Sequence, residues 1–184
     1  GQALPAINAE ANQAPQAVQW LIVPRHPQRF DEVFALLSSA GLRVARRSQW
    51  AQPPQDADVW LGDTLGEMAL YYGLADVALL GGSFAPLGGQ NLIEAAACGC
   101  PVVMGPHTFN FAEVAEQARG AGAAVRVADM AAGMLAAGQW AGDRARLALG
   151  RVQAEAFSTA HRGAAARTAA ALKALLATRP LRAG

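Results

Sequence analysis

Short apolar runs along the chain alternate with segments in which apolar side chains recur every three or four residues. The runs are bounded by Gly, Pro or Asp, a pattern that is typical of buried strands punctuated by turns. We predict six strands, at residues 18–23, 42–48, 59–61, 77–80, 101–104 and 124–127.

The segments between these runs have the period of an α-helix. In residues 27–40 the apolar positions share one face, and Gly41 follows as a C-terminal cap. Asp129 is placed to cap a later helix that contains two methionines. The other helices are expected at 65–73, between Asn91 and Gly99, and between Phe111 and Gly120.

The carboxyl-terminal part is rich in Ala, Arg and Leu. From residue 143 to Pro180 only Gly150 and Gly163 interrupt it, so one or two helices are expected to close the domain. Its arginines favour a solvated helix face, and docking onto a partner domain or an anionic membrane surface is the alternative.

Strands that alternate with helices predict an α/β fold, a Rossmann-like parallel sheet flanked by helices with right-handed crossovers. We expect residues 17–184 to form one such domain, with 160–184 as a C-terminal helix and tail. Residues 1–16 are polar and read as a linker or tail. The loops that follow parallel strands meet at one edge of the sheet, where ligands bind in such folds.

Composition excludes several classes of protein. Hydrophobic residues make up 53% of the 184 residues and charged residues 16%, which indicates a globular chain rather than a disordered one. The net charge of +1 gives no general reason to expect nucleic-acid binding. No apolar run is long enough to cross a bilayer, and no signal peptide opens the sequence.

Cys98 and Cys100 flank Gly99 and lack a second Cys/His pair at zinc-ligand spacing. We therefore expect small buried residues beside a helix end rather than a metal or redox site. This fits a reducing cytosolic environment.

Two glycine pairs suggest a phosphate site. Gly81-Gly82-Ser83 follows one predicted strand, and Gly88-Gly89 precedes the next helix. Such a loop exposes backbone N–H groups near a positive helix end, and Ser83 adds a hydroxyl donor. It is neither a Walker loop nor a dinucleotide fingerprint. The alternative is a tight turn in an ordinary α/β domain.

The following helix carries one carboxylate. Asn91 and Glu94 are three residues apart and share a helix face, and Glu94 lies among apolar neighbours. A carboxylate in that setting needs a partner, which could be ribose hydroxyls of a ligand, a backbone N–H or Arg25. Gln90 can form hydrogen bonds but cannot act as an acid or base near neutral pH.

Other polar residues follow strands as well. Two prolines bracket Arg25 and His26, and the guanidinium of Arg25 suits a phosphate or carboxylate, with a surface ion pair as the alternative. His26 and His107 each follow a proline, and either a ligand contact or a structural role fits them. Asp63 and Glu67 could do no more than cap their helix.

Five blocks in order carry a resemblance to a family. They are Val23–Pro27, Gly62–Glu67, Gly81–Ser83, Gly88–Glu94 and Met104–Phe111, the last reading Met-Gly-Pro-His-Thr-Phe-Asn-Phe. Between about 18 and 167 the sequence resembles the carboxyl-terminal half of 3-deoxy-D-manno-octulosonic acid (Kdo) transferases. The resemblance implies a GT-B glycosyltransferase, with two Rossmann-like domains facing a cleft.

The family resemblance implies that CMP-Kdo is the donor and a lipid A precursor the acceptor, in lipopolysaccharide synthesis at the cytoplasmic face of the inner membrane. No cofactor is implied. No Asp-x-Asp lies in the donor region, so a metal that holds the phosphate is not expected. The implied reaction is an inverting displacement, and its general base belongs to an amino-terminal domain that this sequence lacks.

The resemblance also assigns site residues. It implies that the phosphate and its surroundings are contacted by Arg25, Gly81, Gly82, Ser83 and Asn91. It implies that Glu94 binds the ribose. It also implies that the nucleotide pocket is shaped by Asp63, Thr64, Gly66 and Glu67. Gly62, His26, Gly88, Gly89, Gln90, Pro106 and His107 complete the predicted site. Many family members have His where this chain has Gln90, so proton transfer at that position is in doubt.

The sequence is therefore interpreted as a donor-binding half that binds CMP or CMP-Kdo and transfers nothing alone. Two alternatives stay open. One is a GT-B transferase that uses a UDP-sugar, and the other is a non-catalytic nucleotide-binding or interaction module.

Overall fold

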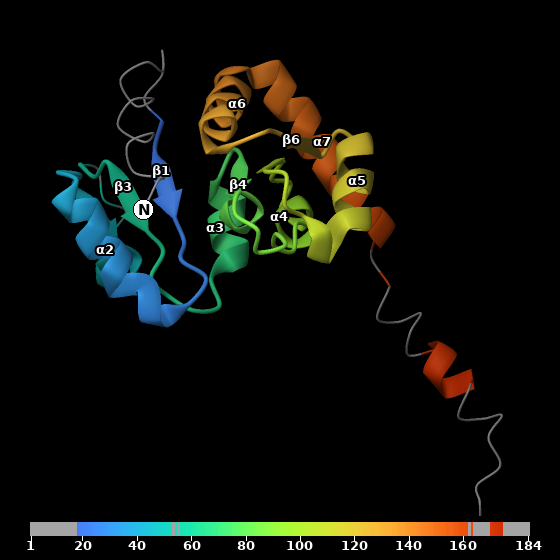
Figure 1. Cartoon of the computed structure of the whole chain (residues 1–184), viewed down its shortest axis with the longest axis horizontal. Coiled ribbons are helices and arrows are strands. Elements are labelled where there is room, and N and C mark those ends of the chain that lie inside the picture. The colour runs from blue at the N-terminus through green and yellow to red at the C-terminus, as the bar shows by residue number, and fades with distance from the viewer. Residues whose placement is uncertain (1–17, 53, 55, 162, 164–169, 175–184) are drawn as a thin grey trace, which may run out of the picture.

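The computed structural model describes residues 18–52, 54, 56–161, 163 and 170–174 (Figure 1). The predicted tail at 1–16 and most of the predicted tail after 161 lie outside these residues. All six predicted strands are present: β1 (Trp20–Ile22), β2 (Val44–Arg46), β3 (Val59–Leu61), β4 (Ala78–Leu80), β5 (Val102–Met104) and β6 (Ala124–Arg126).

The helices also follow the sequence pattern. They are α2 (Phe30–Ser39), α3 (Met68–Leu74), α4 (Ile93–Ala97), α5 (Ala112–Gly120), α6 (Met130–Gly142) and α7 (Arg144–His161). Four 3-10 turns join them, η1 (Pro27–Arg29), η2 (Arg47–Gln49), η3 (Gly81–Ser83) and η4 (Phe109–Phe111). Gly41 has a φ of +80° where α2 ends, and Asp129 caps α6 by accepting from Ala132 N at 2.8 Å. Both predicted caps are confirmed.

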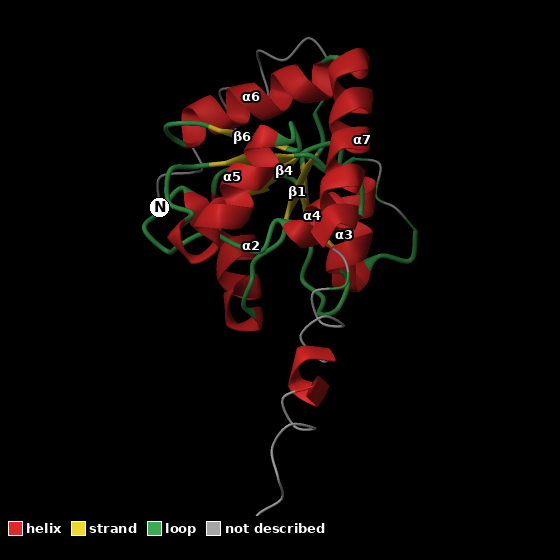
Figure 2. Cartoon of the chain, turned by 90° about the vertical axis from the view of Figure 1, so that its right-hand side faces the viewer, coloured by secondary structure: helices red, strands yellow, loops and turns green. Residues whose placement is uncertain are grey.

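Every strand pair in the described residues is parallel, as predicted, but the pairing forms two sheets rather than one. Their orders are β1-β3-β2 and β4-β5-β6. Figures 1 and 2 show β1 and β4 side by side, where a single sheet would join them. Each strand has only three residues, so the ladders of hydrogen bonds are short.

Alternate residues of the second sheet serve two cores. Ala78, Leu80, Val102, Met104 and Ala124 face one side with α4, α5 and α7. Leu79, Val103 and Val125 face the other side, where α6 covers them with Ala137 and Trp140. Burial on both faces is the expected environment of a parallel sheet.

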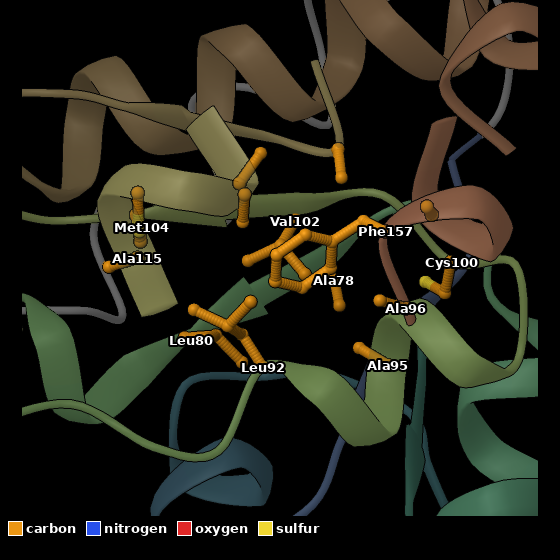
Figure 3. Packing of buried hydrophobic residues seen from close by; sticks show 14 residues of the cluster. Ala78, Leu80, Leu92, Ala95, Ala96, Cys100, Val102, Met104, Ala115 and Phe157 are labelled. Atoms are coloured by element: carbon orange, nitrogen blue, oxygen red, sulfur yellow. The ribbon is translucent and has the colours of Figure 1, made fainter. Parts of the chain in front are cut away.

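The first of these cores is built from small side chains around one aromatic ring. Phe157 of α7 lies between the strand residues Ala78 and Val102 and the alanines of α4 (Figure 3). Ala95, Ala96 and Ala154 are fully buried, so α4 and α7 approach closely. Cys100 is buried in the same cluster as a free thiol, and burial raises its pKa to about 12.

Helix α3 connects the two sheets. Tyr71 packs its ring against Gly62, just after β3, where an added Cβ would lie 2.9 Å from the ring. The next residue, Tyr72, packs against the core of the second sheet. Consecutive side chains on one helix therefore reach both sheets.

Gly150 does not break the last helix. Helix α7 continues through it, so residues 144–161 form one helix. An added Cβ at Gly150 would lie 3.0 Å from the ring of Trp140, so the absence of a side chain lets α7 approach α6 closely.

Two glycines of α6 provide a matched test of this packing. An added Cβ at Gly133 would lie 2.8 Å from the ring of Phe84, whereas at Gly138 nothing lies within 4 Å. We expect Gly133→Ala to lower the free energy of unfolding by about 1–2 kcal/mol through overpacking. Gly138→Ala should raise it by about 0.5–1 kcal/mol through helix propensity. Urea denaturation measures both, and equal effects of the two substitutions would contradict this account of α6.

Candidate functional site

The loops after β1 and β3 leave the first sheet at the same edge. Ile22 is in register with Leu61, and Gly62 N donates to Ile22 O at 2.9 Å. Gly62 is buried against Tyr71, so its role in this structure is packing at the strand end. Asp63 and Thr64, which follow it, lie at the edge that parallel strands share.

The loop after β1 presents a free cation. Arg25 and His26 are both exposed. Within the described part of the chain Arg25 makes no ion pair, whereas the nearby Arg29 pairs with Glu32 at 2.9 Å. The alternative of a surface ion pair at Arg25 is therefore not observed among these residues. Its guanidinium is accessible to an anion.

Two loops of the second sheet form one layer. Leu80 and Met104 are in register at the ends of β4 and β5. Beyond them, His107 N donates to Ser83 O at 2.9 Å, and Asn110 N donates to Gly88 O at 3.1 Å. The glycine-rich loop and the His107 loop are thus held together by their backbones.

The two glycine pairs have different roles. Gly88 and Gly89 have φ of +86° and +83°, and an added Cβ at Gly88 would lie 2.1 Å from Asn110 Nδ2. This pair closes the loop against its neighbour. Gly81 is exposed with nothing within 4 Å of an added Cβ, and Gly82 lies against the side chain of Gln90. The first pair keeps the accessible backbone that an anion requires.

The predicted hydroxyl contact of Ser83 needs correction. Ser83 is fully buried; its Oγ donates to Leu80 O at 2.6 Å and accepts from Gly105 N at 2.7 Å. The hydroxyl proton is therefore used inside the fold. Gly105 permits this contact, since an added Cβ there would lie 2.5 Å from Ser83 O.

Asp63 holds the ends of β3 and β2 together. It is buried, and it accepts from Ser48 N at 2.8 Å, Ser48 Oγ at 2.7 Å and Arg46 Nε at 2.6 Å. Burial alone would raise the pKa of Asp63. The hydrogen bonds from Ser48 and the ion pair with Arg46 outweigh it and hold the pKa below its usual value.

Glu67 belongs to a second polar cluster at this edge. It pairs with Arg47 Nη2 at 2.7 Å, accepts from Tyr71 OH at 3.2 Å and also accepts from the Thr64 hydroxyl. The hydrogen bond from Thr64 is the main cause of its lowered pKa. Neither Asp63 nor Glu67 caps α3 through its side chain, so that alternative is wrong.

The sequence analysis missed Arg46, Arg47 and Ser48 as partners of these carboxylates. The signal was present, because these residues lie at the carboxyl end of a strand, as Asp63 does. Arg46 Nη1 also pairs with Asp31 Oδ1 of α2 at 2.7 Å. This network stabilises the edge of the first sheet at which the Arg25 loop lies.

Glu94 is more accessible than expected. Its side chain is exposed and accepts from Asn91 Nδ2 at 3.3 Å. Because the carboxylate is in contact with solvent, it does not require a further hydrogen-bond partner. Asn91 Oδ1 accepts from Ile93 N at 3.1 Å, which fixes the start of α4. Helix α4 has only five residues, so the anion-attracting helix end predicted here is weak, and loop N–H groups must supply most of the attraction.

The remaining predicted residues lie in the same loops. Pro106 is exposed and His107 half-buried, while Gly66 has a φ of +80° in an open turn. Gln90 is half-buried beside Gly82. Thr108, which the sequence analysis did not single out, is buried and accepts from Arg126 Nη2 at 2.9 Å.

An Asp-x-Asp sequence does occur, at residues 56–58, but it precedes β3 and so lies at the opposite edge of the sheet. Asp58 accepts from Arg43 N at 2.8 Å and from Arg43 Nη2 at 2.7 Å. The hydrogen bonds from Arg43 lower the pKa of Asp58 to about 2. Among the residues that the structure describes, no three His, Cys, Asp or Glu side chains could share a metal ion.

The groups exposed at this edge are suited to binding a ligand. Arg25 makes no ion pair with the described residues, and its guanidinium together with the open backbone of Gly81 and Gly82 suits an anion. The exposed carboxylate of Glu94 suits hydroxyl donors such as those of a ribose. These groups come from both sheets, whose strands β1 and β4 are neighbours (Figure 2).

Comparison with known proteins yields no matching family model. The chain is 50% identical, over 94% of its length, to a 3-deoxy-D-manno-octulosonic acid transferase of Bordetella pertussis, of which the match covers 40%. It is 46% identical to the corresponding protein of Haemophilus influenzae over 51% of this chain and 22% of that protein. The chain thus spans less than half the length of these relatives.

A solved structure covers nearly the same extent as this chain. It is the C-terminal CMP-Kdo binding domain of WaaA from Acinetobacter baumannii, 31% identical, with a TM-score of 0.73. The match includes 85% of this chain and 81% of that domain. Similarity of this kind over most of both chains is evidence of common family as well as common fold.

The Asp63 network makes a pH-dependent prediction. Asp63→Asn removes the charge and leaves Arg46 with only Asp31, so we expect a loss of about 2–4 kcal/mol in the free energy of unfolding near neutral pH. The lowered pKa of Asp63 means that its contribution is complete above its unfolded value of about 3.9 and is lost as the pH falls through the folded value. The gap between variant and parent should therefore narrow below about pH 4.

Urea denaturation across this pH range checks the prediction. Glu32→Gln is the matched control, because it removes one carboxylate charge from an exposed pair with Arg29, which should contribute little to stability. Coincident curves for the parent and Asp63→Asn at neutral pH would show that the buried network does not stabilise the edge.

Proposed function

The chain belongs to the family of 3-deoxy-D-manno-octulosonic acid (Kdo) transferases, of which it spans the carboxyl-terminal domain, and we propose that it is the half that binds the CMP-Kdo donor. The observation that carries this proposal is the likeness to the A. baumannii domain, over most of both chains. The open strand-edge loops described above supply groups of the right chemistry.

The donor phosphate has two sets of partners in this proposal. Arg25 supplies a charge-assisted contact, and the backbone of Gly81 and Gly82 approaches from the second sheet. Asn91 presents its amide Nδ2 beside Glu94. Ser83 and Gly88 act indirectly, because they hold the loop in shape rather than touch the ligand.

The side chains next to the phosphate site bind the nucleoside. Glu94 accepts from the ribose hydroxyls, which its exposure allows. Asp63, Thr64 and Glu67 shape the pocket through the networks that they form, and Gln90, Pro106 and His107 line it. Gln90 donates or accepts a hydrogen bond but transfers no proton.

In the whole enzyme, an acceptor hydroxyl of a lipid A precursor attacks the anomeric carbon of Kdo. Its proton passes to a base of the amino-terminal half, while the bond from that carbon to the CMP phosphate oxygen breaks, with inversion. The present half stabilises the negative charge that develops on the departing CMP, through Arg25 and the loop N–H groups.

We place the whole enzyme at the cytoplasmic face of the inner membrane, where its lipid acceptor is made. In the part of the chain that the structure describes, no helix combines the length and apolarity needed to span a bilayer.

Calorimetry with CMP and UDP tests the proposal. We expect CMP to bind better than UDP. Arg25→Ala should weaken CMP binding about tenfold or more, because a charge-assisted hydrogen bond is worth about 1.5–3 kcal/mol. Arg29→Ala is the control, since Arg29 lies near Arg25 but pairs with Glu32. Preference for UDP would favour a UDP-sugar transferase, and no binding of either nucleotide would favour a non-catalytic module.

A second prediction concerns the missing half. Incubated with CMP-Kdo and a lipid A precursor, the 184-residue chain should form no Kdo-lipid A product, because the base and the acceptor site lie elsewhere. Addition of the full-length enzyme of a relative provides the positive control. Product formed by this chain alone would overturn the assignment of the catalytic base to the other half.

A further inference from the structure

A hollow lies at the outer edge of the second sheet, apart from the loops of the donor site. Its volume is about 430 Å³, and it is bordered by Arg119 at the end of α5, Val125 of β6, Trp140 at the end of α6, and Arg146 and Leu149 of α7. We call it the β6-edge pocket. β6 is the last strand of its sheet and pairs with β5 alone among the described strands.

The pocket is strongly cationic. Three guanidinium groups line it, those of Arg119, Arg126 and Arg146. Arg119 and Arg126 share one carboxylate, Glu116, and their hydrogen bonds lower its pKa. Arg146 has no carboxylate partner among the described residues and lies over the Trp140 ring, 5.1 Å from its centroid. One carboxylate faces three cations, so the pocket attracts anions.

Arg126 is held in place before any ligand binds. Its Nη1 pairs with Glu116 and its Nη2 donates to Thr108 Oγ1 at 2.9 Å. Its Nε–H is buried and meets no acceptor within the described chain. Because this Nε–H is closed off from solvent, a ligand in the pocket would meet the Nη groups of Arg126 rather than Nε. A preorganised fork of this kind suits a phosphate.

The strand edge adds backbone donors. Val102 N donates to Ala123 O, and Val127 N donates to Met104 O, so the odd-numbered residues of this segment face β5. The N–H groups of Ala124 and Arg126 therefore point to the open side of β6. Combined with the guanidiniums, they form a recognition surface for a small oxygen-rich anion.

We propose that the β6-edge pocket binds an anion of the phosphate class, either a free phosphate or pyrophosphate or the headgroup of an anionic phospholipid. The two sources share the same chemistry. Leu149 and Val152 of α7 are 58% and 64% exposed beside the pocket, which a lipid surface would cover. The site does not depend on the donor site, so its failure would leave the proposed function intact.

Titration of the ¹⁵N-labelled 184-residue chain with pyrophosphate tests for the free anion. Saturable shifts are expected at the amides of Ala124 and Arg126, which face the open side of β6, and at the indole N–H of Trp140, which donates to Arg146 O at 3.2 Å. Arg146→Gln should weaken this binding about tenfold, as expected for a lost charge-assisted contact. Arg144→Gln is the matched control, because it makes the same charge change on the same helix outside the pocket.

Flotation with phosphatidylcholine vesicles, with and without phosphatidylglycerol, tests for the headgroup. Binding to the anionic vesicles that Arg146→Gln abolishes and Arg144→Gln retains assigns the pocket to a lipid. Saturable pyrophosphate binding without vesicle binding assigns it to a soluble ligand. The proposal is overturned if neither ligand binds, if both variants lose binding equally, or if the shifts are confined to the Gly81–Gly89 loop of the donor site.

Discussion

The hydroxyl of Ser83 is the contact on which the candidate site depends. It is closed off from solvent, and it joins the end of β4 at Leu80 to the start of the next loop at Gly105. Together with the backbone hydrogen bonds from His107 N and Asn110 N, these two hydrogen bonds set the distance between the glycine-rich loop and the His107 loop. Removal of the hydroxyl would leave the buried N–H of Gly105 without this acceptor, so the arrangement is strongly specified.

Asp63 has the equivalent position in the first sheet. Both residues lie in a loop that follows a strand, both are buried, and both satisfy a backbone N–H of a neighbouring loop. The buried polar groups of these loops thus organise the edge, while exposed ones, such as Arg25 and Glu94, remain available to a ligand. Recognition and support are divided between residues that the sequence pattern cannot tell apart.

Because buried supporting residues and exposed recognition residues look alike in the sequence, only part of the structure could be predicted from it. The six strands, the Asp129 cap and the glycine turns were predictable, because apolar period and turn chemistry act locally. The split into two sheets was not, since it depends on whether three-residue strands come close enough to pair. The roles of Ser83 and Asp63 were missed for a related reason: a hydroxyl or carboxylate after a strand fits a ligand and a neighbouring loop equally well. Only Ser48 and Gly105, distant in sequence, decide between the two.

The adjacent tyrosines of α3 have a mechanical consequence. The ring of Tyr71 packs against Gly62, just after the first sheet's strand β3, and Tyr72 packs against the core of the second sheet. A shift of one sheet relative to the other would break the packing of one of these two rings, because neighbouring residues of a short helix cannot move independently. The two groups of loops that form the edge are therefore coupled through α3, which opposes hinging between the two sheets.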